Sequence, residues 1–200
     1  MSSLIGHSLI GGAIGWVPFP AQSRWNFLRS VWIGWLVIIA VVPDLDYVIP
    51  TLNPGGNEGL RITHSLLFAL GLPMLTYLGF VIVGIRGQKL WWVGGSLALA
   101  GLSHICLDLL VGVTALPLLW PASDRLFRLP FGLLPSAGKI SLFNYYFYYN
   151  LVIELGVLLP LLLGALIHRS RVSVEQKWGI KFTLLLVSTY FMHWAYGLSR

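Results

Sequence analysis

The feature that most constrains this chain is a series of apolar runs, each about as long as a membrane-spanning helix. A helix needs about 20 mostly apolar residues to cross the roughly 30 Å of hydrocarbon in a bilayer. Four runs reach the required length: residues 62–85, 90–111, 141–167 and 180–198. A fifth run, residues 27–42, is marginal, because it includes Arg29 and is followed by Pro43. The runs predict an all-α, polytopic transmembrane bundle of about five or six hydrophobic helices.

The composition supports lipid as the surroundings of most of the surface. Of the 200 residues, 56% are hydrophobic and 10% are charged, whereas roughly 25% of the residues in a soluble domain are charged. So few charged side chains cannot cover a soluble fold. The length fits one bundle. We predict that residues 1–140 carry the functional site and that residues 141–200 add two C-terminal transmembrane helices to the same domain.

Residues 4–17 form a shorter apolar run that is rich in glycine. This run predicts a tilted span, a re-entrant helix or a helix packed against the bundle, and the sequence does not choose among them. In each case the small residues would let neighbouring backbones approach closely.

The distribution of charge predicts the orientation in the membrane. The net charge is +6, but the basic residues lie in short clusters between apolar runs, so no direct nucleic-acid partner is expected. The loops at 18–29, 86–89 and 168–181 hold eight basic residues and one acidic residue. The opposite side, with 44–61, 120–139 and the C-terminus, holds five basic and four acidic residues. The positive-inside rule makes the first side cytoplasmic.

Several ionisable residues fall within or beside the apolar runs, where such groups are costly and mark functional sites. His104 and Asp108 are four residues apart, which places both on one face of a helix. With the predicted orientation, all of these residues lie near the non-cytoplasmic face. They comprise three of the five histidines and three of the seven acids: His7, His64 and His104, with Asp44, Asp46 and Asp108.

Histidine and carboxylate ligands suit zinc or another divalent first-row ion, and an oxygen-rich site suits manganese or magnesium. The six residues provide enough ligands for one or two ions. A metal with an open position lowers the pKa of bound water to about 7 and so favours hydrolysis. Ser65 and Ser103 are weaker candidates for a nucleophile, because neither lies in a strand-turn-helix elbow.

Structural roles remain open for each of these groups. Asp44 and Asp46 suit a turn and cap after Pro43, and Thr63 suits a helix cap. His104 with Asp108 equally suits a buried structural pair or a proton relay. Other polar groups have their own alternatives: Glu154 as a partner of the site or of a basic residue, and Arg125, Arg128 and Lys139 as ligands of lipid phosphate or markers of the interface.

Four motifs resemble those of a known family: Gly6-His7, Pro43-Asp44-Leu45-Asp46, Thr63-His64-Ser65-Leu66-Leu67, and Ser103-His104-Ile105 followed by Asp108. Together with the stretch 116–130, they resemble the LexA-binding, inner-membrane-associated metal-dependent hydrolases (the YdjM-like family), whose hydrolase activity is itself a prediction. The resemblance covers residues 4–135. Two positions depart from the family pattern, since Tyr47 and the residues before Thr63 stand where the family often has a histidine.

The resemblance implies a multi-pass protein of the prokaryotic inner membrane that is a metal-dependent hydrolase. We predict that it acts on phosphoesters or lipid-linked substrates, with membrane lipids as partners. We assign Asp46 and Asp108 as candidate catalytic residues. The candidate metal ligands are His7, Asp44, His64, His104 and Asp108, with zinc as the favoured ion. The competing hypothesis is a non-enzymatic membrane scaffold or transport-related protein in which a His/Asp cluster holds helices together.

Overall fold

The computed structural model describes residues 2–16, 26–47, 49, 60–138, 143–167 and 172–198. Within these residues the fold is all-helical, as predicted, apart from one isolated β-bridge between Leu116 and Phe127. Two short 3-10 helices, η1 (Val42–Tyr47) and η4 (Ile62–His64), accompany the α-helices. The described residues form six α-helices: α1 (Leu4–Trp16), α2 (Asn26–Val41), α3 (Leu66–Ile82), α4 (Gly87–Val111), α5 (Tyr145–Leu166) and α6 (Val174–Tyr196).

Three helical segments among the described residues are long and apolar enough to cross a membrane. They are Leu28–Tyr47, Gly87–Val111 and Tyr145–Leu166. The first corresponds to the run that the sequence left marginal, because η1 extends α2 beyond Pro43. α1 and α3 are also apolar but shorter, at 13 and 17 residues.

Capping side chains explain why two helices begin away from the predicted positions. The run at 62–85 is divided because the Ser65 side chain accepts a hydrogen bond from the backbone N–H of Phe68, so α3 begins at Leu66. α6 begins before residue 180, because Ser173 and Gln176 form a capping box. The start of the predicted run at 141 lies outside the described residues.

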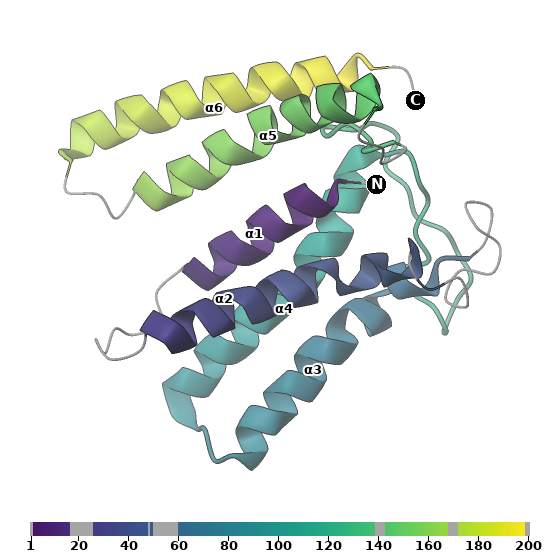
Figure 1. Ribbon diagram of the computed structural model, residues 1–200, viewed down its shortest axis with the longest axis vertical. Helices are drawn as coiled ribbons and strands as arrows, with labels where there is room; N and C mark the ends of the chain where they lie inside the picture. Colours follow the sequence, from purple (N-terminus) through teal and green to yellow (C-terminus); the bar gives the residue numbers. More distant parts are fainter. Residues whose placement is uncertain are drawn as a thin grey trace. The chain divides into compact units, whose positions relative to one another are not determined.

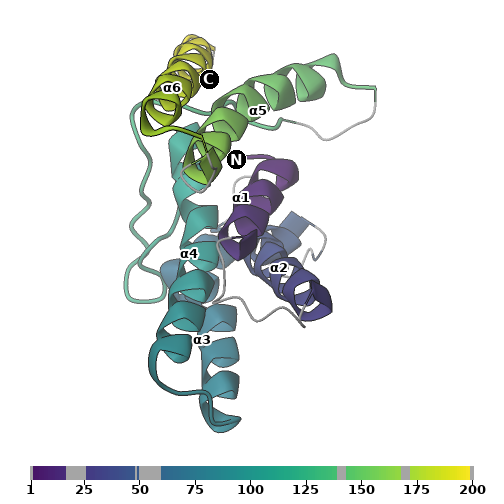
Figure 2. The ribbon, with the colours of Figure 1, turned by 90° about the vertical axis from the view of Figure 1, so that its left-hand side faces the viewer.

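The chain divides into two compact units. The first, called here the histidine unit, comprises His7–Cys106 and Ala115–Arg128. In it α1 lies beside α2, and α3 and α4 form an antiparallel pair (Figures 1 and 2). Its buried apolar core combines side chains from α2 and α4: Leu36, Ile39, Val93, Leu97 and Ala100.

Glycines allow the helices of the histidine unit to approach closely. A Cβ at Gly11 would lie 2.9 Å from the backbone oxygen of Leu36, and one at Gly15 would lie 2.9 Å from Ile33 Cγ1. A Cβ at Gly101 of α4 would collide with the Ala69 carbonyl of α3. The predicted role of small residues in close backbone contact is therefore confirmed for α1.

The second unit comprises Met1–Gly6, Leu107–Thr114 and Leu129–Arg200. Its main feature is the antiparallel pair α5 and α6, which lie side by side in both views (Figures 1 and 2). Ser188 donates a hydrogen bond to the carbonyl of Val157 at 3.0 Å, and Trp194 Nε1 donates to the Tyr149 hydroxyl at 2.8 Å. This pair is therefore joined by local polar contacts as well as by apolar packing.

Candidate metal centre

The centre begins where α2 gives way to η1. The tighter 3-10 turn begins at Val42, includes Pro43 and carries two aspartates, Asp44 and Asp46. Both are buried, with exposures of 8% and 3%. Asp44 lies beside all three histidines, whereas Asp46 is paired with Arg61 and also lies 3.7 Å from His64 Nδ1. The two carboxylates of this motif therefore have different surroundings and different roles.

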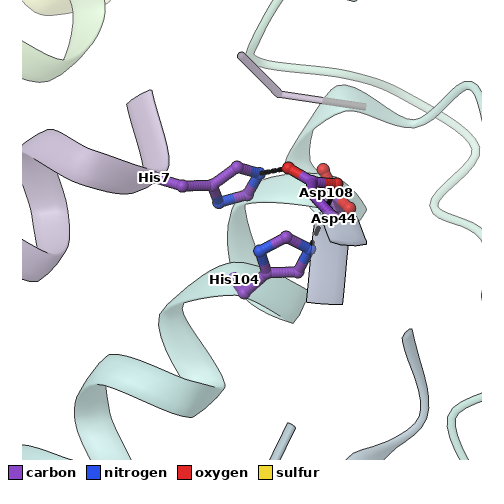
Figure 3. Close-up of side chains that lie close together, drawn as sticks. All are labelled: His7, Asp44, His104 and Asp108. Carbon is purple, nitrogen blue, oxygen red and sulfur yellow. Dashed lines mark ion pairs between the residues drawn. The ribbon is translucent and has the colours of Figure 1, made fainter. Parts of the chain in front are cut away.

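Three histidines from three different elements surround Asp44. His7 lies on α1, His64 on η4 and His104 on α4, and all three are fully buried. His7 Nε2 lies 3.8 Å from Asp44 Oδ2. His64 Nε2 and His104 Nε2 lie 3.6 and 3.8 Å from Asp44 Oδ1. Figure 3 shows the rings of His7 and His104 beside Asp44.

The imidazole rings also contact one another. His7 and His104 are stacked, with ring centroids 3.9 Å apart. His64 meets His104 edge to face, and their Nε2 atoms are 3.2 Å apart. The three imidazole rings therefore pack closely together, and Asp44 is the carboxylate that lies beside all of them.

A backbone contact determines which nitrogen of His104 carries a proton. His104 Nδ1 lies 2.8 Å from the carbonyl oxygen of Ala40. A carbonyl oxygen only accepts hydrogen bonds, so Nδ1–H must be the donor. In the neutral ring Nε2 is then the acceptor nitrogen, which is the form that binds a metal.

Asp46 lies beside this cluster in an ion pair with Arg61. Arg61 Nε and Nη2 donate to the two carboxylate oxygens at 2.6 and 2.5 Å. The guanidinium also lies over the Tyr47 ring, 4.4 Å from its centroid. Burial lowers the pKa of Arg61, but its hydrogen bond to Asp46 and the charges of Tyr47, Asp46 and Asp44 outweigh burial and raise the pKa. Arg61 therefore stays charged beside Asp46.

Asp108 follows His104 by one turn of α4, as its spacing predicts. It is buried, with 1% exposure, and accepts a hydrogen bond from the backbone N–H of Ser2 at 2.8 Å within the second unit. Figure 3 draws it on the turn of α4 after His104. Its position one turn after His104 on α4 keeps Asp108 a candidate ligand.

Other polar residues have structural partners. Glu154 is also buried, but it accepts hydrogen bonds from the Ser2 hydroxyl and from the Ser3 backbone N–H. No sequence signal pointed to these two serines. Ser65 caps α3 in place of the predicted Thr63, and Ser103 donates to the Ala100 carbonyl at 2.8 Å. Lys139 lies outside the described residues.

The donor set of the histidine unit fits a divalent ion. His7, Asp44 and His104 each offer one ligand atom, and these atoms lie within 4.8 Å of one another. Zinc binds histidine nitrogen at about 2.0–2.1 Å, so two tetrahedral nitrogen ligands lie about 3.3 Å apart. The 3.2 Å between His64 Nε2 and His104 Nε2 matches that spacing. The residues present therefore suit zinc by chemistry and by geometry.

Comparison with protein families agrees with the motifs around this centre. The family model described as "YdjM inner membrane protein" matches residues 1–196. The chain belongs to the YdjM family. The match extends over α5 and α6, beyond the residues 4–135 that carried the resemblance, and the family description with the apolar helices places this YdjM-family chain in a membrane. No curated protein and no solved structure matches the chain.

Proposed function

We propose that this YdjM-family protein is a metal-dependent hydrolase of the inner membrane. One observation carries the proposal: His7, His64 and His104 come from three separate elements and all direct Nε2 toward the buried carboxylate of Asp44. Burying such groups is unfavourable unless they are paired or bind a metal. A bound divalent ion would offset that cost.

In this proposal His7, His64, His104 and Asp44 bind the ion, and Asp108 is a further ligand or general base on the next turn of α4. When bound, zinc would polarise a substrate oxygen and acidify water. Asp46 was a catalytic candidate in the sequence. Because Arg61 binds both of its oxygens, we now assign Asp46 to positioning and leave Asp108 as the proton acceptor.

A phosphoester or lipid-linked substrate fits the location of the centre. The candidate span Leu28–Tyr47 contains Asp44, and the span Gly87–Val111 contains His104 and Asp108. Ligands carried by two apolar segments favour a substrate that reaches the protein from lipid. We further propose that the centre faces the non-cytoplasmic side, following the positive-inside rule.

A structural role for the cluster is the second candidate, and the burial of its ligands favours it. His7, His64 and His104 each have 0% exposure, whereas a catalytic site needs an open position for water or substrate. In this alternative the polar groups hold α1, η4 and α4 together, with or without an ion.

Elemental analysis combined with a hydrolase assay separates these candidates. The detergent-purified wild type should contain stoichiometric zinc or another divalent metal and should hydrolyse a phosphoester probe such as p-nitrophenyl phosphate or phosphatidic acid. His104→Ala should lose both. The matched control is His193→Ala, since His193 is exposed on α6, and it should keep both.

Three other outcomes are informative. Bound metal without turnover of either probe would support the structural candidate over the enzyme. A wild type that contains no metal, and whose thermal unfolding does not change with chelator, would overturn the metal centre itself. Turnover that persists in His104→Ala would separate any hydrolysis from this site.

A further inference from the structure

A chain of hydrogen bonds links Arg61 to His64 through two intermediate side chains. Arg61 holds Asp46 in a bidentate ion pair. The Thr63 hydroxyl lies 3.1 Å from Asp46 Oδ2 and 2.9 Å from His64 Nδ1. Each side chain is buried, with exposures from 0% to 5%. The order along this chain is guanidinium, carboxylate, hydroxyl and imidazole.

The chemistry of each group fixes the direction of every hydrogen bond. Both oxygens of Asp46 accept hydrogen bonds from Arg61, and the Thr63 hydroxyl donates its single proton to Asp46 Oδ2. The hydroxyl oxygen can then only accept from His64. Nδ1 of His64 therefore carries a proton, and in the neutral ring Nε2 is the acceptor nitrogen.

The same tautomer follows for His104 from an unrelated contact, the carbonyl of Ala40. Both Nε2 atoms then direct lone pairs into one region, 3.2 Å apart and beside Asp44. Two neutral rings of this tautomer cannot hydrogen-bond to each other through Nε2. The repulsion between their lone pairs and the carboxylate is relieved by a cation, either a metal ion or a proton on one ring. The hydrogen bond at Nδ1 of His64 thus determines what its Nε2 can bind.

We propose that Arg61, Asp46 and Thr63 form a relay that fixes His64 in the Nδ1–H tautomer and presents its Nε2 to a cation beside Asp44. The inference rests on the proposed metal-dependent function for the identity of the cation, and it names Arg61 and Thr63 as positioning residues. Partners of this kind behind a metal-binding histidine typically affect affinity or activity by 10- to 100-fold.

The tautomer is measured first, in the metal-free protein. Histidine ¹⁵N chemical shifts in detergent report which ring nitrogen carries the proton. The wild type should show His64 protonated at Nδ1, assigned by comparison with a His64→Gln sample. Thr63→Val keeps the shape of the side chain but removes the hydroxyl, and it should produce a mixture of tautomers. Thr63→Ser restores the hydroxyl and should restore the wild-type spectrum.

Zinc affinity is measured next, by competition with a chromophoric chelator. Thr63→Val, Asp46→Asn and Arg61→Lys should each bind zinc about 10- to 100-fold more weakly. They should still reach the wild-type stoichiometry at saturation. Thr63→Ser should bind within a few-fold of wild type. Circular dichroism confirms that each variant is folded, and Thr63→Ser supplies a folded reference at the same position.

The outcomes distinguish this inference from the proposed function. If the wild type binds no zinc, the metal centre fails, but the tautomer measurement still tests the relay. If the wild type binds zinc and Thr63→Val shows both wild-type affinity and the wild-type tautomer, the relay is overturned while the metal centre remains. An Nε2–H tautomer of His64 in the metal-free wild type would also overturn the relay.

Discussion

The histidine unit contains two buried regions of opposite chemistry, built largely from the same helices. α4 contributes Leu97 to the apolar core and, two turns later, His104 to the candidate metal centre. α2 contributes Leu36 to the core, and Asp44 follows it in η1. Both regions are almost completely excluded from solvent. Burial therefore does not separate them, whereas the type of side chain does.

The comparison shows which buried side chains require a hydrogen bond or a bound ion. The apolar core is stabilised by close packing of side chains that have no charge or hydrogen-bonding group to satisfy. The candidate metal centre buries three imidazoles and a carboxylate, each of which needs a hydrogen bond or an ion. We expect the core to be independent of bound metal and the centre to depend on it, and the following predictions test that difference.

The largest effect is expected for Asp44→Asn. The amide removes the negative charge that faces all three histidines, so zinc content should fall to background by elemental analysis. Asp124→Asn is the matched control, since Asp124 is exposed, and it should keep full occupancy. Retention of metal in Asp44→Asn would contradict the expectation that Asp44 is required for metal binding in this region.

Leu97→Ala tests the opposite region. Leu97 is 1% exposed within the core, and removing such a side chain costs about 2 to 5 kcal/mol of stability. Thermal or denaturant unfolding in detergent should show the loss, while zinc content should stay at the wild-type value. Loss of zinc from this folded variant would show that the core and the centre are coupled.

A smaller effect is expected at the junction of η4 and α3, which positions His64. Ser65→Ala removes the cap that accepts from the Phe68 backbone N–H at 3.2 Å and should cost about 1 kcal/mol. Ser65→Asp, which can still cap the helix, should lose less. An unfolding midpoint of Ser65→Ala equal to that of wild type would indicate that the cap does not stabilise α3.

The smallest effect is expected for Trp194→Phe on α6. This change removes one hydrogen bond to Tyr149 but keeps an aromatic ring, and hydrogen bonds between membrane helices average about 0.6 kcal/mol. The unfolding midpoint should fall slightly, and metal content should not change. Tyr149→Phe removes the other partner of the same bond and should give an equal shift.

The sequence predicted the elements better than their boundaries. Apolar runs and glycine spacing indicated a helical membrane protein, because a span depends on local hydropathy. The division of residues 62–85 was missed, because Ser65 caps a helix only where the backbone of η4 already leaves the helical path. The early start of α6 depends likewise on a local cap, at Ser173 and Gln176.

The candidate ligands could be named from the sequence because ionisable residues are rare in apolar segments. The sequence could not predict that Asp44 lies among the histidines while Asp46 pairs with Arg61. Asp44 and Asp46 are equivalent in the motif, yet one faces three histidines and the other binds Arg61. Arg61 stands among the positions that depart from the family pattern, and nothing in its spacing indicated a bidentate partner 15 residues earlier.

By itself, the sequence determined that this chain is a helical membrane protein with a few ionisable residues within or beside its apolar runs. Only the tertiary structure decided which of those residues meet, which groups contact the ring nitrogens of His64 and His104, and which aspartate lies beside all three imidazoles. The physical reason is range: hydropathy acts on each segment separately, whereas tautomers and ion pairs depend on the positions of atoms that distant segments bring together.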